Sequence, residues 1–130
     1  MMDKKKFHIE YIFDNVSIKS LWNQITTPPG LSSWFADDVV IRDKVYTFRW
    51  KKDYQEATKV QELPEEKVRY QWDEDYGSPY YFEFLIRTYE LTGATSLEIT
   101  DFAEPEDLKD SIHLWDSQVE QLKRTLGILV

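Results

Sequence analysis

Aromatic side chains are the residues of this sequence with the clearest capacity for binding chemistry. They make up 15% of 130 residues, as five Trp, eight Tyr and seven Phe. Such rings either fill a core or line a concave apolar site, and they close a cavity as readily as they line one. A filled core and a usable pocket therefore both remain open. The positions predicted to contact a ligand are Trp34, Phe35, Phe48, Trp50, Tyr70, Trp72, Phe82, Phe84, Trp115 and Val119.

Groups typical of catalysis or of metal binding are sparse. There is no Cys, and the two histidines, His8 and His113, lack the spacing of a metal site, so we predict no metal and no cofactor. No nucleophile motif and no phosphate-binding glycine loop is present, so we predict no catalytic residue. An enzyme would need a titratable group facing the interior, and Glu56, Glu83 and Tyr70 are the only residues we expect within reach.

Two other polar features have a plain structural interpretation. Residues 73–78 superficially resemble a calcium loop, but Ser78 and Phe84 occupy the positions that require Gly and Glu. Arg49 and Arg87 are predicted on the strand face opposite the aromatic row. If that register is wrong by one residue, they point inward and could bind an anionic head group.

The charge of the chain limits its partners. With 16 basic and 24 acidic residues the net charge is −8, which disfavours both nucleic acid and anionic membrane surfaces. No apolar run is long enough to cross a bilayer, and the basic start is followed by a strand pattern rather than a signal sequence. We expect a cytoplasmic protein.

Periodicity predicts a first strand and then one or two short helices. Apolar residues alternate over residues 7–13. Ser17 is a suitable N-cap for a helix whose apolar face is spaced at i, i+3, i+4 and i+7 over residues 18–25. Residues 27–30 end that helix, and their prolines favour a second helix that carries Leu31, Trp34 and Phe35.

A run of short strands and a long helix complete the chain. Strands are expected at residues 39–41, 46–50, 54–63, 68–72, 82–87 and 96–100. Thr92-Gly93 suits a two-residue hairpin loop. The last helix begins near Pro105 and ends before Gly127. Its apolar stripe consists of Leu108, Ile112, Trp115, Val119, Leu122 and Leu126.

Short connections between successive strands predict an antiparallel meander, and one helical stripe must cover its apolar face. The prediction is one α+β domain over residues 1–130, with a curved sheet of about six to seven strands around a long C-terminal helix.

Three segments carry a family resemblance. They are residues 16–35, VSIKSLWNQITTPPGLSSWF; residues 60–72, with a Glu-Leu-Pro turn before a strand that ends in Trp; and residues 114–127, with Trp-Asp near the middle of the helix. Their order resembles the START-like (SRPBCC) superfamily of helix-grip proteins, in the branch similar to the C-terminal domain of the Hsp90 activator Aha1. The resemblance implies the helix-grip fold, with either apolar ligand binding or chaperone association, and it brings no catalytic set.

The sequence leaves three hypotheses. In the first, the chain binds an apolar or amphipathic small molecule between the C-terminal helix and the sheet. The alternative is a protein-interaction or co-chaperone-like domain without a ligand, whose acidic surface would dock a basic partner. The third, an enzyme, has the least support.

Overall fold

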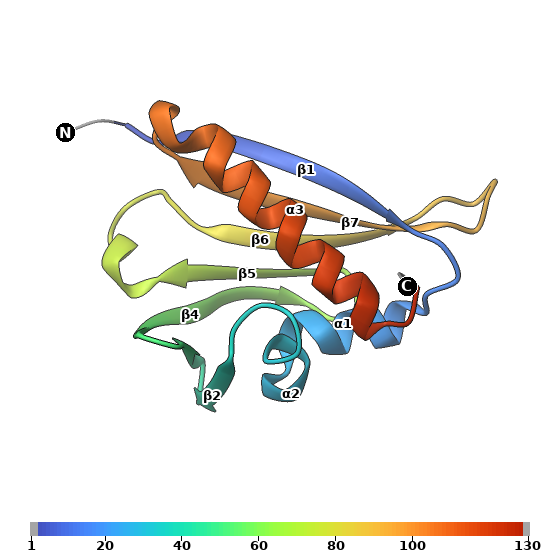
Figure 1. Cartoon of the computed structure of the whole chain (residues 1–130), viewed down its shortest axis with the longest axis horizontal. Coiled ribbons are helices and arrows are strands. Elements are labelled where there is room, and N and C mark those ends of the chain that lie inside the picture. Colours follow the sequence, from blue (N-terminus) through green and yellow to red (C-terminus); the bar gives the residue numbers. More distant parts are fainter. Residues whose placement is uncertain (1–2, 129–130) are drawn as a thin grey trace.

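The computed structural model describes residues 3–128, and it is a curved sheet crossed by a long helix (Figure 1). The strands are β1 (Lys5–Phe13), β2 (Asp38–Arg42), β3 (Val45–Trp50), β4 (Asp53–Leu63), β5 (Lys67–Trp72), β6 (Phe82–Thr88) and β7 (Thr95–Ala103). The helices are α1 (Ile18–Thr26), α2 (Pro28–Leu31) and α3 (Leu108–Thr125), with short 3-10 turns η1 (Asp73–Asp75) and η2 (Pro105–Asp107).

All seven strands form one antiparallel sheet in the order β1-β7-β6-β5-β4-β3-β2. The predicted meander is confirmed from β2 to β7, because each of these strands pairs with the next one along the chain. The first strand joins the last, with Ile9 opposite Ile99. In this order β3, β5 and β7 run in the same direction, so these three strands end at the same end of the sheet.

Two short helices follow β1, as predicted. Ser17 caps α1 by accepting from the backbone N–H of Ser20, and the Thr27 hydroxyl caps α2 by accepting from the N–H of Gly30. The second helix is shorter than expected. It ends at Leu31, and the N–H groups of both Phe35 and Ala36 donate to the Leu31 carbonyl. Because this tight turn competes with a further helical turn, Trp34 and Phe35 lie after the helix rather than on it.

The predicted two-residue loop at Thr92-Gly93 is wrong. Strands β6 and β7 separate after the pair Thr88 and Thr95. The N–H of Tyr89 donates to the carbonyl of Ala94, and the N–H of Gly93 donates to that of Tyr89, so a longer loop closes the hairpin. Gly93 has a φ of +71°, the conformation for which a glycine is favoured.

Helix α3 crosses the sheet diagonally and supplies the other side of the core (Figure 1). Pro105 begins the turn η2 rather than the helix itself. At the other end Gly127 has a φ of +79°, and the N–H groups of Ile128 and Gly127 donate to the carbonyls of Lys123 and Arg124. This is the Schellman arrangement, which satisfies carbonyls at the end of the helix. Trp115, Val119 and Leu122 are its buried residues.

The predicted orientation of the two arginines is also confirmed. Arg49 and Arg87 are exposed on the outer face of the sheet, where Arg87 pairs with Glu98 of the neighbouring strand. The interior thus contains no arginine from these strands. None of the helices within residues 3–128 is long and apolar enough to cross a membrane.

Candidate ligand-binding site

Three strands each place an inward residue near their C-terminal end at the same position in the fold. The inward rows are Tyr46, Phe48 and Trp50 on β3; Val68, Tyr70 and Trp72 on β5; and Leu97, Ile99 and Asp101 on β7. In each row the first two side chains are at most 1% exposed, whereas the third is only partly buried. The core is therefore filled along most of the sheet and opens at the end where these strands stop.

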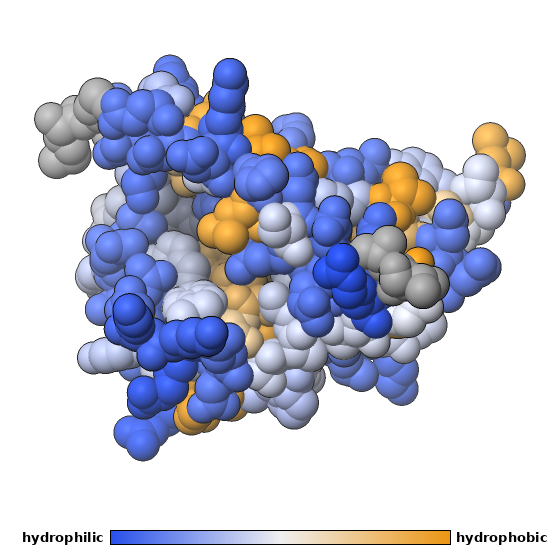
Figure 2. Space-filling view, viewed as in Figure 1, coloured by the Kyte–Doolittle hydropathy of each residue, from blue (hydrophilic) through white to orange (hydrophobic). Residues whose placement is uncertain are grey.

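A cavity of about 220 Å³ occupies that end, under the N-terminal half of α3. Its lining consists of Phe35, Trp50, Gln55, Trp72, Asp101, Ser111, Leu114, Trp115 and Gln118. The four helix positions are spaced at i, i+3, i+4 and i+7, which places them on one face of α3. In the space-filling view the surface is hollowed beside this part of the helix (Figure 2).

The residues predicted to contact a ligand divide into three groups. Phe35, Trp50, Trp72 and Trp115 line the cavity. Trp34 lies beside it and lines an adjoining surface groove, which also contains Leu114. The remaining predicted residues are at most 1% exposed and fill the core behind the cavity: Phe48, Tyr70, Phe82, Phe84 and Val119. The structure thus contains both a packed core and a small opening.

The carbonyl of Phe35 connects the segments that form the wall of the cavity. It accepts the indole N–H of Trp50 at 3.1 Å and the side-chain amide of Gln118 at 3.2 Å, so the turn after α2 is fixed to both β3 and α3. The Phe35 ring stacks against Trp115, with ring centroids 5.8 Å apart and planes inclined by 21°. It also stacks against Trp72 at 6.4 Å and 15°. These contacts give the aromatic wall a defined shape without a ligand.

Asp101 is the one carboxylate in the lining, and both of its oxygens accept hydrogen bonds. The indole N–H of Trp115 donates to Oδ2 at 2.9 Å, and the backbone N–H of Phe102 donates to Oδ1 at 2.8 Å. Burial raises the pKa of Asp101 from its ordinary value of 3.8 to about 6, and these two donors oppose the rise.

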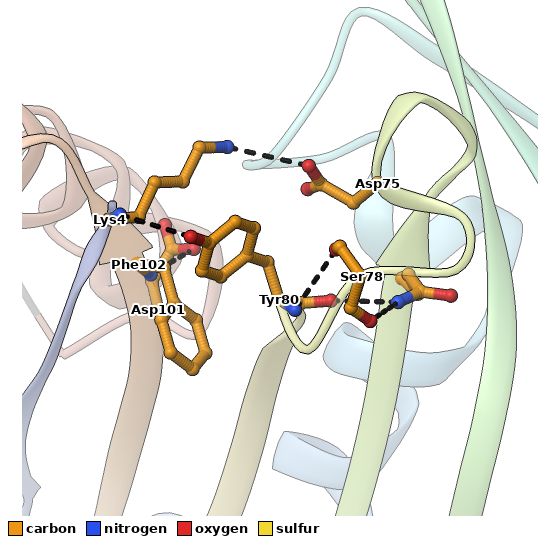
Figure 3. A network of polar contacts seen from close by, with 7 residues as sticks. Lys4, Asp75, Ser78, Tyr80, Asp101 and Phe102 are labelled. Carbon is orange, nitrogen blue, oxygen red and sulfur yellow. Dashed lines mark hydrogen bonds and ion pairs between the residues drawn. The ribbon is translucent and has the colours of Figure 1, made fainter. Parts of the chain in front are cut away.

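Two charged groups lie near Asp101. Lys4, just before β1, forms an ion pair with Asp75 of η1 at 3.4 Å, and its backbone N–H donates to the Tyr80 hydroxyl at 3.1 Å (Figure 3). The Lys4 ammonium lowers the pKa of Asp101 and the Asp75 carboxylate raises it, but both effects are smaller than that of burial. Because Lys4 is engaged with Asp75, Asp101 has no cationic partner among the described ion pairs.

Replacing this carboxyl should change how stability depends on pH. Because the pKa is raised in the folded state, the carboxyl of wild type costs no stability well below pH 3.8, and the cost grows between pH 3.8 and about 6 and is fully present above that range. A rise of this size corresponds to about 3 kcal/mol. Asn removes this cost because it is uncharged, but it has only one acceptor oxygen for the two donors. We therefore expect Asp101→Asn to be about 1–2 kcal/mol more stable than wild type at pH 7.5.

Urea unfolding of both proteins at pH 4 and pH 7.5 measures this difference. It should be largely lost at pH 4, close to the ordinary pKa of 3.8, because the carboxyl is then neutral in the folded chain and only partly ionised in the unfolded chain. A variant less stable than wild type at pH 7.5 would show that the hydrogen bonds of the carboxylate outweigh the cost of burying it.

Sequence reasoning missed Asp101, together with Gln55, Ser111, Leu114 and Gln118 in the lining. The titratable residues considered in its place lie elsewhere. Glu56 accepts from Thr47 in an exposed contact, Glu83 pairs with Arg69 at 2.8 Å, and Tyr70 donates to the Ile25 carbonyl within the core.

Metal-binding chemistry finds little support outside the cavity. His8 and His113 are exposed. Asp75, in the loop that resembles a calcium site, is paired with Lys4. The carboxylates of Glu104, Glu106 and Asp107 lie within 4.8 Å of one another, but they are mostly exposed, which is common for acidic groups without an ion.

A curved antiparallel sheet wrapped around a long C-terminal helix, with two short helices after the first strand, defines a helix-grip protein. The model of the START-like superfamily domain matches residues 1–128, and the chain belongs to this superfamily. No curated protein matches the sequence significantly.

Solved structures share this fold. The protein BfR322 from Bacteroides fragilis is 44% identical over 95% of this chain and 92% of its own, with a TM-score of 0.69. The Aha1 dimer from Colwellia psychrerythraea is 20% identical over 94% of this chain and 97% of its own, with a TM-score of 0.75. DynU16, a putative protein in the dynemicin biosynthetic locus, is 14% identical over 96% of this chain and 47% of its own, with a TM-score of 0.72.

Proposed function

We propose that this protein binds a small amphipathic molecule in the cavity beneath α3. The observation that carries the proposal is an open cavity with four aromatic walls and one carboxylate, at the end of a core that is otherwise filled. The START-like superfamily, known for ligand binding in a hydrophobic cavity, supports the same function. Apolar walls with a few convergent polar groups are the usual composition of a small-molecule site.

The size of the cavity restricts the ligand. At about 220 Å³ it is smaller than the roughly 300–1,000 Å³ of sites that enclose a drug-sized molecule. An adjoining groove of about 430 Å³ shares Phe35, Trp50, Leu114 and Gln118 with the cavity and continues past Trp34. A ligand with a compact end and an apolar chain matches this shape, with its end in the cavity and its chain along the groove.

Filling the cavity from the helix tests the proposal. Ser111 lines the cavity and is only partly buried, so Ser111→Trp can occupy the space without changing the core behind it. We expect the affinity for the uncharged fluorescent probe N-phenyl-1-naphthylamine to fall at least about tenfold, which corresponds to 1.4 kcal/mol. Ser111→Ala should bind as wild type does.

Fluorescence titration of the three proteins gives the affinities, and thermal unfolding confirms that the variants fold. Native mass spectrometry of the purified wild type shows whether a ligand is retained. If Ser111→Trp bound the probe with the affinity of wild type, the probe would bind outside the cavity. A wild type that neither binds the probe nor retains a ligand would end the proposal.

The protein-interaction hypothesis has less support. Its support is the likeness to Aha1, and at 20% identity that likeness shows the fold alone. The two hypotheses separate in one experiment, because a surface interaction would survive Ser111→Trp whereas ligand binding would not. A pull-down can also detect a combination of the two. If one protein partner were lost both from Ser111→Trp and from wild type whose cavity is blocked by a ligand, the cavity would take part in the protein interaction.

An enzymatic role has one supporting residue. Asp101 is a titratable group in the cavity wall, but the other lining side chains are Phe, Trp, Gln, Ser and Leu, none of which titrates near neutral pH. With no second acid or base opposite the carboxyl, this geometry supports binding.

A further inference from the structure

The wall of the cavity contains a single ionisable group, and that group is negative. Among the nine lining residues, Asp101 is accompanied only by aromatic rings, two carboxamides, one hydroxyl and one aliphatic chain. No Lys, Arg or His belongs to the lining. A ligand that enters the cavity therefore meets negative charge and polarizable rings, and no positive charge.

The charge of Asp101 is incompletely compensated within the described chain. Its two hydrogen-bond donors, the indole of Trp115 and the backbone of Phe102, are both uncharged. The Lys4 ammonium, whose charge acts on Asp101, contacts Asp75 instead, at 3.4 Å. Buried or partly buried charges are ordinarily paired, because removal from water is costly. A cation supplied by the ligand would complete the pair.

Aromatic rings surround the same space. Trp50, Trp72 and Trp115 line the cavity together with Phe35. Two of the indole N–H groups already have partners: Trp50 donates to the Phe35 carbonyl and Trp115 donates to Asp101. These two indoles hence contribute π surface rather than free donors. An ammonium group near such faces is stabilised by about 0.5–2 kcal/mol, and Trp is the most effective of the aromatic residues.

From this combination we propose that the compact end of the ligand is a cation, an alkylammonium group held by the Asp101 carboxylate and the rings of Trp50, Trp72 and Trp115. This inference rests on the proposed small-molecule function and specifies its ligand class. The apolar part of the ligand extends along the groove past Trp34 and Leu114. A fatty acid does not fit in this orientation, because its carboxylate would face Asp101.

Three probes with the same chain and different head groups test the charge preference: octyltrimethylammonium, octyl glucoside and octyl sulfate, each below its micelle concentration. Isothermal titration should give an affinity for octyltrimethylammonium at least about tenfold higher than for the other two, equivalent to 1.4 kcal/mol. Equal affinities would overturn the cationic head group while leaving the cavity as an apolar site. Failure of all three to bind would overturn the proposed function as well.

A matched pair of variants separates the local effect from the general attraction of an acidic protein for cations. Asp101→Asn should lower the affinity for octyltrimethylammonium about tenfold and leave that for octyl glucoside unchanged. Asp43→Asn removes the same charge at the opposite end of β3 from Trp50, at a φ of +56° that Asn tolerates, and should bind as wild type does. Equal losses in both variants would overturn the assignment to Asp101.

The pH dependence provides a further check, because a quaternary ammonium does not titrate. Protonation of Asp101 near pH 6 removes its charge, so the affinity of wild type for octyltrimethylammonium should fall between pH 7.5 and pH 5. Lys4 and Asp75 are the charged groups that influence this carboxyl, and Trp115 of α3 faces it with an uncharged donor. Asp101→Asn should show no such fall, and a fall of equal size in that variant would contradict the proposal.

Discussion

Trp115→Ala is expected to lower the free energy of unfolding by about 3–5 kcal/mol. The indole is 6% exposed and lies at the boundary between the packed core and the cavity. On the core side its ring is 5.9 Å from that of Phe84, at nearly right angles, and on the cavity side it stacks on Phe35. The substitution removes both packing contacts and the hydrogen bond to Asp101.

Urea unfolding at pH 7.5 measures this loss, and Trp115→Phe is the matched control. Phenylalanine retains most of the apolar packing but cannot donate to Asp101, so about 1–2 kcal/mol should be lost. If Trp115→Ala cost no more than Trp115→Phe, the indole would contribute little to the core, and α3 would be held to the sheet mainly by Val119 and Leu122.

The sequence was sufficient for the strand alternation and for the aromatic part of the site. Alternation in β3 and β5 identified Trp50 and Trp72 as inward residues, and the stripe of α3 identified Trp115. The same rule identifies Asp101, since Leu97 and Ile99 precede it at spacings of two. It was missed because the expected strand ended at residue 100, one residue before Asp101 and three residues before the end of β7.

The division between core and cavity was beyond sequence reasoning. Phe48 and Trp50 share one row and one strand, yet Phe48 is fully buried while Trp50 is half-buried and lines the cavity. Periodicity gives the face of a strand but not where the opposing layer stops. Here the opposing layer is formed by α3 and by the turn that contains Phe35, whose position depends on contacts between distant segments.

That turn is positioned by the packing of α2 on α1, and Gly30 makes the packing possible. A Cβ at position 30 would lie 2.1 Å from the carbonyl oxygen of Asn23 and 2.7 Å from the Cα of Gln24, both backbone atoms of α1. The indole N–H of Trp34 donates to the Gln24 carbonyl at 2.8 Å, which attaches the following turn to the same stretch of α1. The glycine of the sequence ITTPPGL is thus explained by a close approach of two backbones.

Gly30→Ala should accordingly cost at least about 3 kcal/mol, because backbone atoms cannot yield as a flexible side chain would. Displacement of α2 would also move Phe35, so surviving folded protein should bind N-phenyl-1-naphthylamine more weakly than wild type.

Gly93→Ala is the control: its Cβ meets nothing within 4 Å, and only its φ of +71° is unfavourable, for about 1–2 kcal/mol. Urea unfolding compares the two. If Gly30→Ala cost no more than Gly93→Ala and left probe binding intact, the contact between α1 and α2 would not position the cavity wall, and Phe35 would be held by Trp50 and Gln118 alone.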